Sequence, residues 1–162
     1  MRIVTSILAL LLVTACDREG TTPTPDTAAT SDTTSETTDA KNAPSKHEDP
    51  AFAVSLAPQE PYSVGKESKL DAVLEARGEY HCNDEYPYKF KLDPAPEGVS
   101  YAADVAKDIE KGEKRSVLPI KFTAKTPGKK KIGGTFYFSV CNKEHCKIDK
   151  KPMSITVDVP AS

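Results

Sequence analysis

The residues with the most evident chemistry are Cys141 and Cys146, which lie near the end of the chain in the stretch FSVCNKEHCKIDK. Four residues separate them, and alternating apolar and polar residues precede and follow the pair. Two thiols at this spacing suit a structural disulfide, a disulfide that exchanges with other thiols, or ligation of a soft metal ion. The choice depends on the other cysteines and on the fold that positions the pair.

Cys82 leaves the disulfide pairing open. Without Cys16, which belongs to a sorting signal described below, three cysteines remain, and any single disulfide leaves one of them free. A Cys141–Cys146 bond closes a small loop and stabilises the fold little, which favours a chemical role for the pair. A bond from Cys82 to either partner would close about 60 residues and stabilise by about 4 kcal/mol as a structural bridge.

Two histidines adjoin these cysteines: His81 precedes Cys82, and His145 precedes Cys146. Together with the thiols they offer ligands for copper or zinc, so His81, Cys82 and His145 are weak metal-site candidates. Neighbouring residues on a strand point to opposite faces, however, so His81 and Cys82 should not reach one site. A positive neighbour such as His145, Lys143 or Lys147 would instead stabilise a thiolate in the pair.

Strands must position these residues, because alternation with a period of two recurs within residues 51–162. The residues expected on inward faces are Leu70, Ala72, Leu74, Tyr86, Tyr88, Phe90, Leu92, Leu118, Ile120, Phe122, Phe136, Phe138, Val140, Met153, Ile155, Val157 and Val159. Turn signals such as Pro96-Glu97-Gly98 and Pro127-Gly128 separate these runs. Cys141 and Cys146 then lie at the mouth of the last hairpin.

The pattern predicts an all-β fold, an immunoglobulin-like antiparallel β-sandwich of about seven strands over residues 51–162. Pro119 suits an edge or irregular strand, and Gly133-Gly134 predicts a bulge or tight bend. A helix over DVAKDIEKGEK is the local rival, but it has too few apolar residues to bury a face.

The stretch GTFYFSVCNKEHCKIDKKPMSITVDV resembles the end of the N-terminal periplasmic domain of the thiol:disulfide interchange protein DsbD family. The resemblance covers these 26 residues, and the rest of the domain matches by strand pattern alone. It implies an immunoglobulin-like sandwich whose late hairpin carries a redox-active cysteine pair, here Cys141 and Cys146. It also implies electron transfer by thiol–disulfide exchange with a thioredoxin-like envelope partner and no cofactor. The spacing departs from the family, in which we expect five residues between the cysteines.

The N-terminal stretch MRIVTSILALLLVTAC has the features of a secretory signal, with Arg2 before an apolar run that is too short to span a bilayer. Its ending, Val13-Thr14-Ala15-Cys16, resembles the lipobox of bacterial lipoproteins. We therefore expect residues 1–15 to be a signal peptide and Cys16 to carry the lipid that anchors the chain to a membrane of the bacterial envelope. Which of the two membranes holds it stays open.

Residues 16–50 are expected to be the lipidated cysteine and a disordered tether. Residues 17–50 are rich in Thr, Asp, Ser, Ala and Pro and contain no Val, Ile, Leu, Phe or Tyr, so nothing offsets the entropy of ordering them. The tether is acidic, whereas lysines gather late in the chain, mostly as solvated faces of strands. The sequence contains no nucleic-acid, phosphate-binding or hydrolase motif.

Three functions follow from these observations. The first is thiol–disulfide exchange by Cys141 and Cys146 with a thioredoxin-like partner, which would make the protein at most an exchange partner rather than a classical enzyme. The second is a non-catalytic binding or scaffold module with structural cysteines. The third is copper or zinc binding in the envelope.

Overall fold

A computed structural model describes residues 43–161, and these residues form an all-β antiparallel sandwich, as the sequence predicted. The described part of the chain contains no helix, so DVAKDIEKGEK is not helical. In chain order the strands are β1 Lys46–Glu48, β2 Phe52–Pro58, β3 Glu67–Ala76, β4 His81–Cys82, β5 Lys89–Leu92, β6 Val99–Tyr101, β7 Val105–Ala106, β8 Arg115–Ala124, β9 Gly128–Cys141 and β10 Cys146–Val159.

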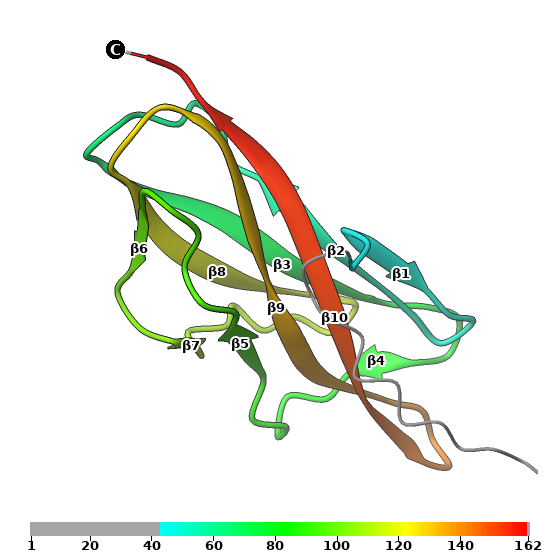
Figure 1. The fold of residues 1–162 in the computed structure, drawn as a ribbon. Coiled ribbons are helices and arrows are strands. Elements are labelled where there is room, and N and C mark those ends of the chain that lie inside the picture. The colour runs from blue at the N-terminus through cyan, green and yellow to red at the C-terminus, as the bar shows by residue number, and fades with distance from the viewer. Residues whose placement is uncertain (1–42, 162) are drawn as a thin grey trace, which may run out of the picture. The chain divides into compact units, whose positions relative to one another are not determined.

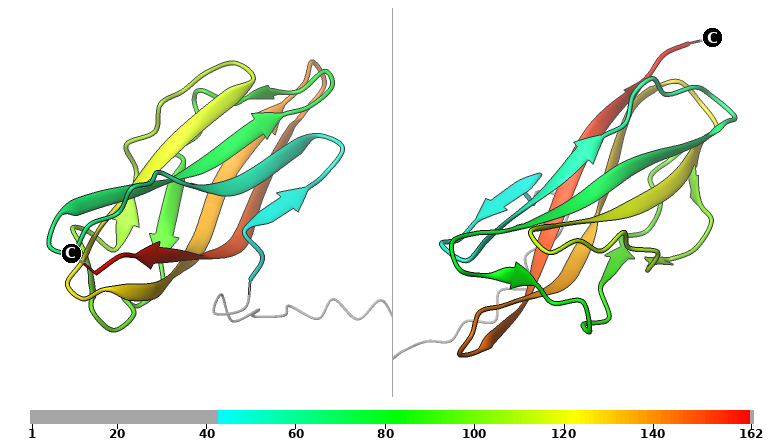
Figure 2. Two further views of the ribbon diagram at one scale, coloured as in Figure 1. Left: turned by 90° about the horizontal axis from the view of Figure 1, so that it is seen from above. Right: turned by 180° about the vertical axis from the view of Figure 1, so that it is seen from behind.

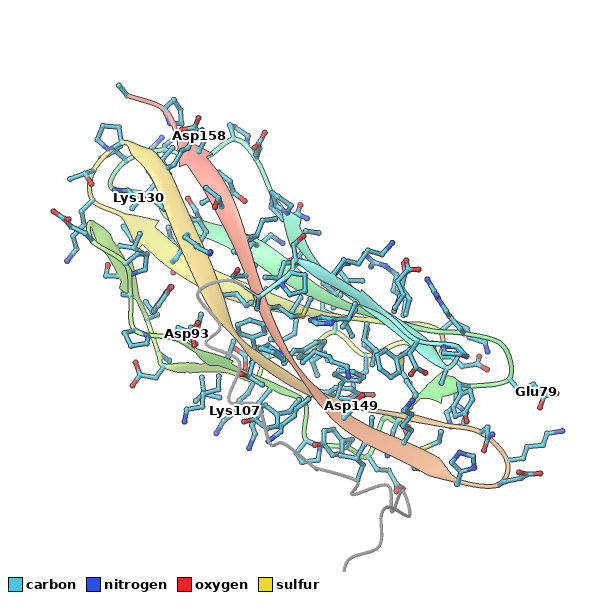
Figure 3. The ribbon with its side chains drawn as sticks, turned by 45° about the vertical axis from the view of Figure 1, so that its right-hand side comes forward. Glu79, Asp93, Lys107, Lys130, Asp149 and Asp158 are labelled. Atoms are coloured by element: carbon cyan, nitrogen blue, oxygen red, sulfur yellow. A yellow bond between two sulfur atoms is a disulfide. The ribbon has the colours of Figure 1, made fainter. Side chains whose placement is uncertain are left out.

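Two antiparallel sheets face each other (Figures 1 and 2). One has the order β1-β2-β3-β8-β6, and the other has the order β10-β9-β5-β7, with β4 paired to β9 off this path. The expected number of strands was too low because β1, β4, β6 and β7 are only two or three residues long. Such short pieces cannot show a periodicity in the sequence.

The core lies between the sheets and is built from the inward residues of the long strands, as the alternation predicted. Phe52 of β2 packs edge-on against Phe138 of β9, with ring centroids 4.7 Å apart. Phe136 lies between Phe138 and Phe90, at 5.4 Å and 6.2 Å. Of the β10 residues expected to point inward, Ile155 is half-buried and Met153, Val157 and Val159 are buried.

The folded part begins before Ala51, where we had expected the tether to end. β1 pairs with β2 from Lys46 opposite Ser55, and the Ser154 amide of β10 donates to the Pro44 carbonyl at 3.3 Å. These contacts use the main chain, which needs no apolar side chain, so composition could not reveal them. The expected signal peptide, the expected lipid site Cys16 and the first part of the expected tether lie outside the described residues.

Gly133 and Gly134 do not form the predicted bulge, because β9 and β10 pair in unbroken register from Cys141–Cys146 to Gly128–Val159. Glycine is needed here for close approach: a Cβ at Gly134 would collide with the Lys91 carbonyl oxygen and the Phe90 ring. Pro119 of β8 is opposite Asp71 of β3, and β6 pairs with the other side of β8 only from Phe122 onward. Pro119 therefore lies where β8 has a neighbouring strand on one side only, as its missing N–H requires.

Candidate functional site

The tip of the β9–β10 hairpin brings the two cysteines together. Cys141 ends β9, Cys146 begins β10, and the two are directly opposite in register. Asn142 shapes the intervening loop: its side-chain oxygen accepts from the amides of Glu144 at 3.0 Å and His145 at 2.9 Å. The backbone amide of Asn142 donates to the His145 carbonyl at 3.0 Å. A local side-chain cap of this kind holds the loop without help from the core.

Cys141 and Cys146 form a disulfide, with their Cα atoms 4.0 Å apart. The two halves of this bond differ in access to solvent. Cys141 is 6% exposed, whereas Cys146 is exposed to solvent. The hairpin tip extends past β4 at one end of the molecule (Figure 1). A reagent from solvent therefore meets the Cys146 side of the bond first.

His81 lies beside the disulfide on the outer face of the sheet. β4 pairs with β9 so that His81 is opposite Cys141, and β10 places Cys146 on the other side of the same residue. Paired residues share a face, so His81, Cys141 and Cys146 form one row across three strands. The Tyr80 hydroxyl lies 3.1 Å from His145 Nε2, which ties the segment before β4 to the hairpin loop.

Cys82 forms no disulfide, and the alternative in which it bridges to the hairpin is wrong. Its register partner on β9 is Val140, which points into the core, so the Cys82 thiol also points inward. Cys141 follows Val140 and points to the opposite face. Burial raises the pKa of the Cys82 thiol, and a hydrogen bond with the Ser116 side chain lowers it in part. Cys82 is thus a buried, neutral core residue.

The metal-site candidates do not converge on one point. His81 faces outward, Cys82 faces the core, and His145 contacts the Tyr80 hydroxyl. Among residues 43–161, no three His, Cys, Asp or Glu side chains are arranged to hold a metal ion. The divergence of His81 and Cys82 follows from strand geometry, as the sequence predicted.

Lys147 does not act on the disulfide, although its place in the sequence suggested that it might stabilise a thiolate. It lies opposite Val140 on the inner face, 2.7 Å from the Asp49 carboxylate and 5.2 Å from the centre of the Phe52 ring. The hydrogen bond from the Lys147 ammonium to the Asp49 carboxylate lowers the pKa of Asp49 and raises the pKa of Lys147. This ion pair joins the β1–β2 turn to β10 and covers the edge of the core.

Sequence reasoning missed Ile148. It lies two positions after Cys146 on the same outer face and is 67% exposed, which makes it the one exposed large apolar side chain in the described part of the chain. The alternation in CKIDK could have placed Ile148 beside Cys146. The alternation could not show which of the two alternating sets faces the core. The inner set at this end of β10 includes Lys147 and Lys151, which cover the Phe52 ring, so charge does not mark the outer face here.

Comparison with known proteins adds little to this geometry. No family model and no curated protein matches the sequence. The fold is similar to that of AggA, the major subunit of aggregative adherence fimbriae type I from Escherichia coli, with a TM-score of 0.33 and 11% identity over 70% of this chain and 99% of that chain. Nothing about function follows from a likeness this distant. Within residues 43–161 we find no helix with the length and apolar character to cross a membrane.

Proposed function

We propose that the Cys141–Cys146 disulfide exchanges with the thiols of a thioredoxin-like partner. The observation that carries this proposal is the placement of the bond: it joins an exposed Cys146 to a buried Cys141 at the tip of a projecting hairpin. A disulfide with one accessible side can be attacked there, while the other cysteine is held ready to reform the bond. The small loop that it closes gives little reason for a purely structural staple.

The reaction has two steps. A partner thiolate attacks Cys146 Sγ, the bond to Cys141 Sγ breaks, and Cys141 leaves with the electron pair as a thiolate. A mixed disulfide now joins the partner to Cys146. The partner's second thiolate attacks its own bonded sulfur and releases Cys146 as a thiolate. Two electrons pass from the partner dithiol to Cys141 and Cys146, and two protons follow, so the partner ends as a disulfide.

The resemblance to the DsbD family supports the same role, since it aligns Cys141 and Cys146 with a redox-active pair in a late hairpin. We also propose that the chain is anchored to the bacterial envelope through lipid on Cys16, which would hold the domain in an oxidising compartment. Substitution of Cys16 by serine should move the full-length protein from the membrane fraction to the soluble fraction. Retention in the membrane fraction would contradict the anchor and leave the exchange proposal untouched.

The reduction potential of the pair tests the exchange. The full-length Cys82→Ala variant is equilibrated in glutathione buffers of graded potential, trapped with an alkylating agent, and mapped by peptide mass spectrometry. We expect a potential well above about −300 mV, because structural disulfides typically lie below that value. A potential at or below about −300 mV would assign the bond a structural role and favour the non-catalytic binding module.

A further inference from the structure

The outer face of β9 and β10 continues beyond the disulfide as a series of cross-strand rows. The first row holds His81, Cys141 and Cys146. The second pairs Ser139 with Ile148. The register therefore places an exposed apolar side chain one row from the exposed cysteine, a rise of about 7 Å along β10.

Ser139, opposite Ile148, is fully buried although it lies on the outer face. The Asn83 side chain donates to its hydroxyl at 3.3 Å, and the Asn83 amide donates to its carbonyl at 3.1 Å. The Tyr88 hydroxyl donates to the same carbonyl at 3.0 Å. The residues around Asn83 thus cover the β9 side of this row, and Ile148 is the member of the row that faces solvent.

The third row is basic. Tyr137 of β9 is opposite Lys150 of β10 on one side and Lys89 of β5 on the other. Both lysines are exposed, and Lys89 Nζ lies 4.9 Å from the centre of the Tyr137 ring. The fourth row adds exposed Lys91. Along one face, the order is therefore disulfide, apolar side chain, then positive charge.

We propose that this face is the docking surface for the thiol-bearing partner, with Ile148 as its apolar anchor and Lys89 and Lys150 as its charged rim. The partner that fits is a dithiol protein with apolar residues around its reactive cysteine and carboxylates farther out. An apolar contact one row from the attacked sulfur would hold the partner thiol over Cys146, and opposite charges would raise the rate of encounter. This inference rests on the exchange proposed above.

Exchange kinetics test the surface, with reduced thioredoxin, a small acidic dithiol protein, as the probe and dithiothreitol as a small dithiol that needs no docking surface. For Ile148→Ser in the full-length protein, we expect the second-order rate constant with thioredoxin to fall about tenfold, as for loss of an interface anchor. The rate constant with dithiothreitol should stay within about twofold. Ile148→Leu should keep most of the thioredoxin rate, since an apolar contact remains.

The charged rim has a matched control on the opposite sheet. The pair Lys89→Glu and Lys150→Glu should slow the thioredoxin reaction about tenfold at low salt, and added salt should shrink the difference. The pair Lys66→Glu and Lys69→Glu changes the net charge equally, at two exposed positions, one just before β3 and the other near the start of its pairing with β8, and should have a much smaller effect.

The outcomes separate the two proposals. If wild-type protein reacts with thioredoxin no faster than with dithiothreitol, the exchange function itself is contradicted. If wild-type protein reacts rapidly and the Ile148 and lysine variants match it, the function stands and this docking surface is wrong. Circular dichroism of each variant, compared with wild type, shows whether the fold is retained.

Discussion

On its inner face, the β9–β10 hairpin places Phe136, Phe138 and Val140 in the core, each with no exposed surface. On its outer face, the intervening β9 residues lead to Cys141 and the disulfide. The same contrast separates two cysteines: Cys82 shares the inner face with Val140, whereas Cys141, one position farther along β9, shares the outer face with Cys146. A shift of one residue in the pairing of β4 with β9 would therefore exchange the two faces, so this register decides that Cys82 is a core thiol and that Cys141 is free to bond Cys146.

The largest effect should come from the inner face. Phe138→Ala removes a fully buried ring that packs against Phe52 and Phe136, and we expect a loss of about 3–5 kcal/mol in the free energy of unfolding. Tyr137→Ala, on the half-buried outer neighbour, should cost about 1 kcal/mol. Urea denaturation of both variants measures the difference. Equal losses in the free energy of unfolding would show that the outer face of β9 contributes to the stability of the fold as much as the inner face does.

The second prediction concerns the reactivity of Cys82. In native, fully reduced protein, we expect iodoacetamide to modify Cys82 at least about 100-fold more slowly than in urea, because the thiol reacts only when the core opens. The raised pKa of the buried Cys82 thiol acts in the same direction. Cys146 should react readily in the same sample. Mass spectrometry of each peptide over time gives both rates, and rapid native modification of Cys82 would place it outside the core.

A smaller effect is expected from the disulfide. Replacing both Cys141 and Cys146 by serine should lower the free energy of unfolding by about 2 kcal/mol, since the closed loop is short. The main-chain pairing of β9 with β10 and the hydrogen bonds of Asn142 do not involve the sulfur atoms, so we expect them to hold the hairpin in the variant. Chemical denaturation of the variant beside oxidised wild type measures the change. A loss above about 4 kcal/mol would identify the bond as a structural staple.

The smallest effect should come from the ion pair between Asp49 and Lys147. Because Lys147 lowers the pKa of folded Asp49, the pair stabilises the protein above the unfolded Asp pKa of about 3.9. That contribution is lost as the pH falls through the lowered folded pKa. Asp49→Asn should cost under about 1 kcal/mol at pH 7, and its difference from wild type should shrink below about pH 4.

Glu75→Gln provides a matched control for this prediction. It removes a carboxylate from a more exposed pair, with Arg115 at 3.7 Å, and should change stability less than Asp49→Asn. Unfolding midpoints across a pH series measure both variants. An Asp49→Asn deficit that persists undiminished at pH 2 would contradict the ion-pair account.

Much of the fold could be predicted from the sequence because long strands with one buried face leave a readable alternation. Phe136, Phe138 and Val140 were placed correctly for that reason, and so was the hairpin that follows them. Strands β1 and β4 were not found, since each is only two or three residues long and is held by main-chain pairing. The candidate site was half predicted: the cysteine pair was identified, but Ile148 was not.

The sequence by itself determined that the last hairpin would carry two cysteines close to one another, because a period of two in both flanking runs leaves them opposite across a short loop. It did not decide which thiol stays free, since any of three pairings satisfies the count. Only the tertiary structure decided this, through the register of β4 against β9. That register is fixed by contacts between residues about 60 positions apart, where no local pattern specifies the partner, and it turns Cys82 into the core and leaves Cys141 to Cys146.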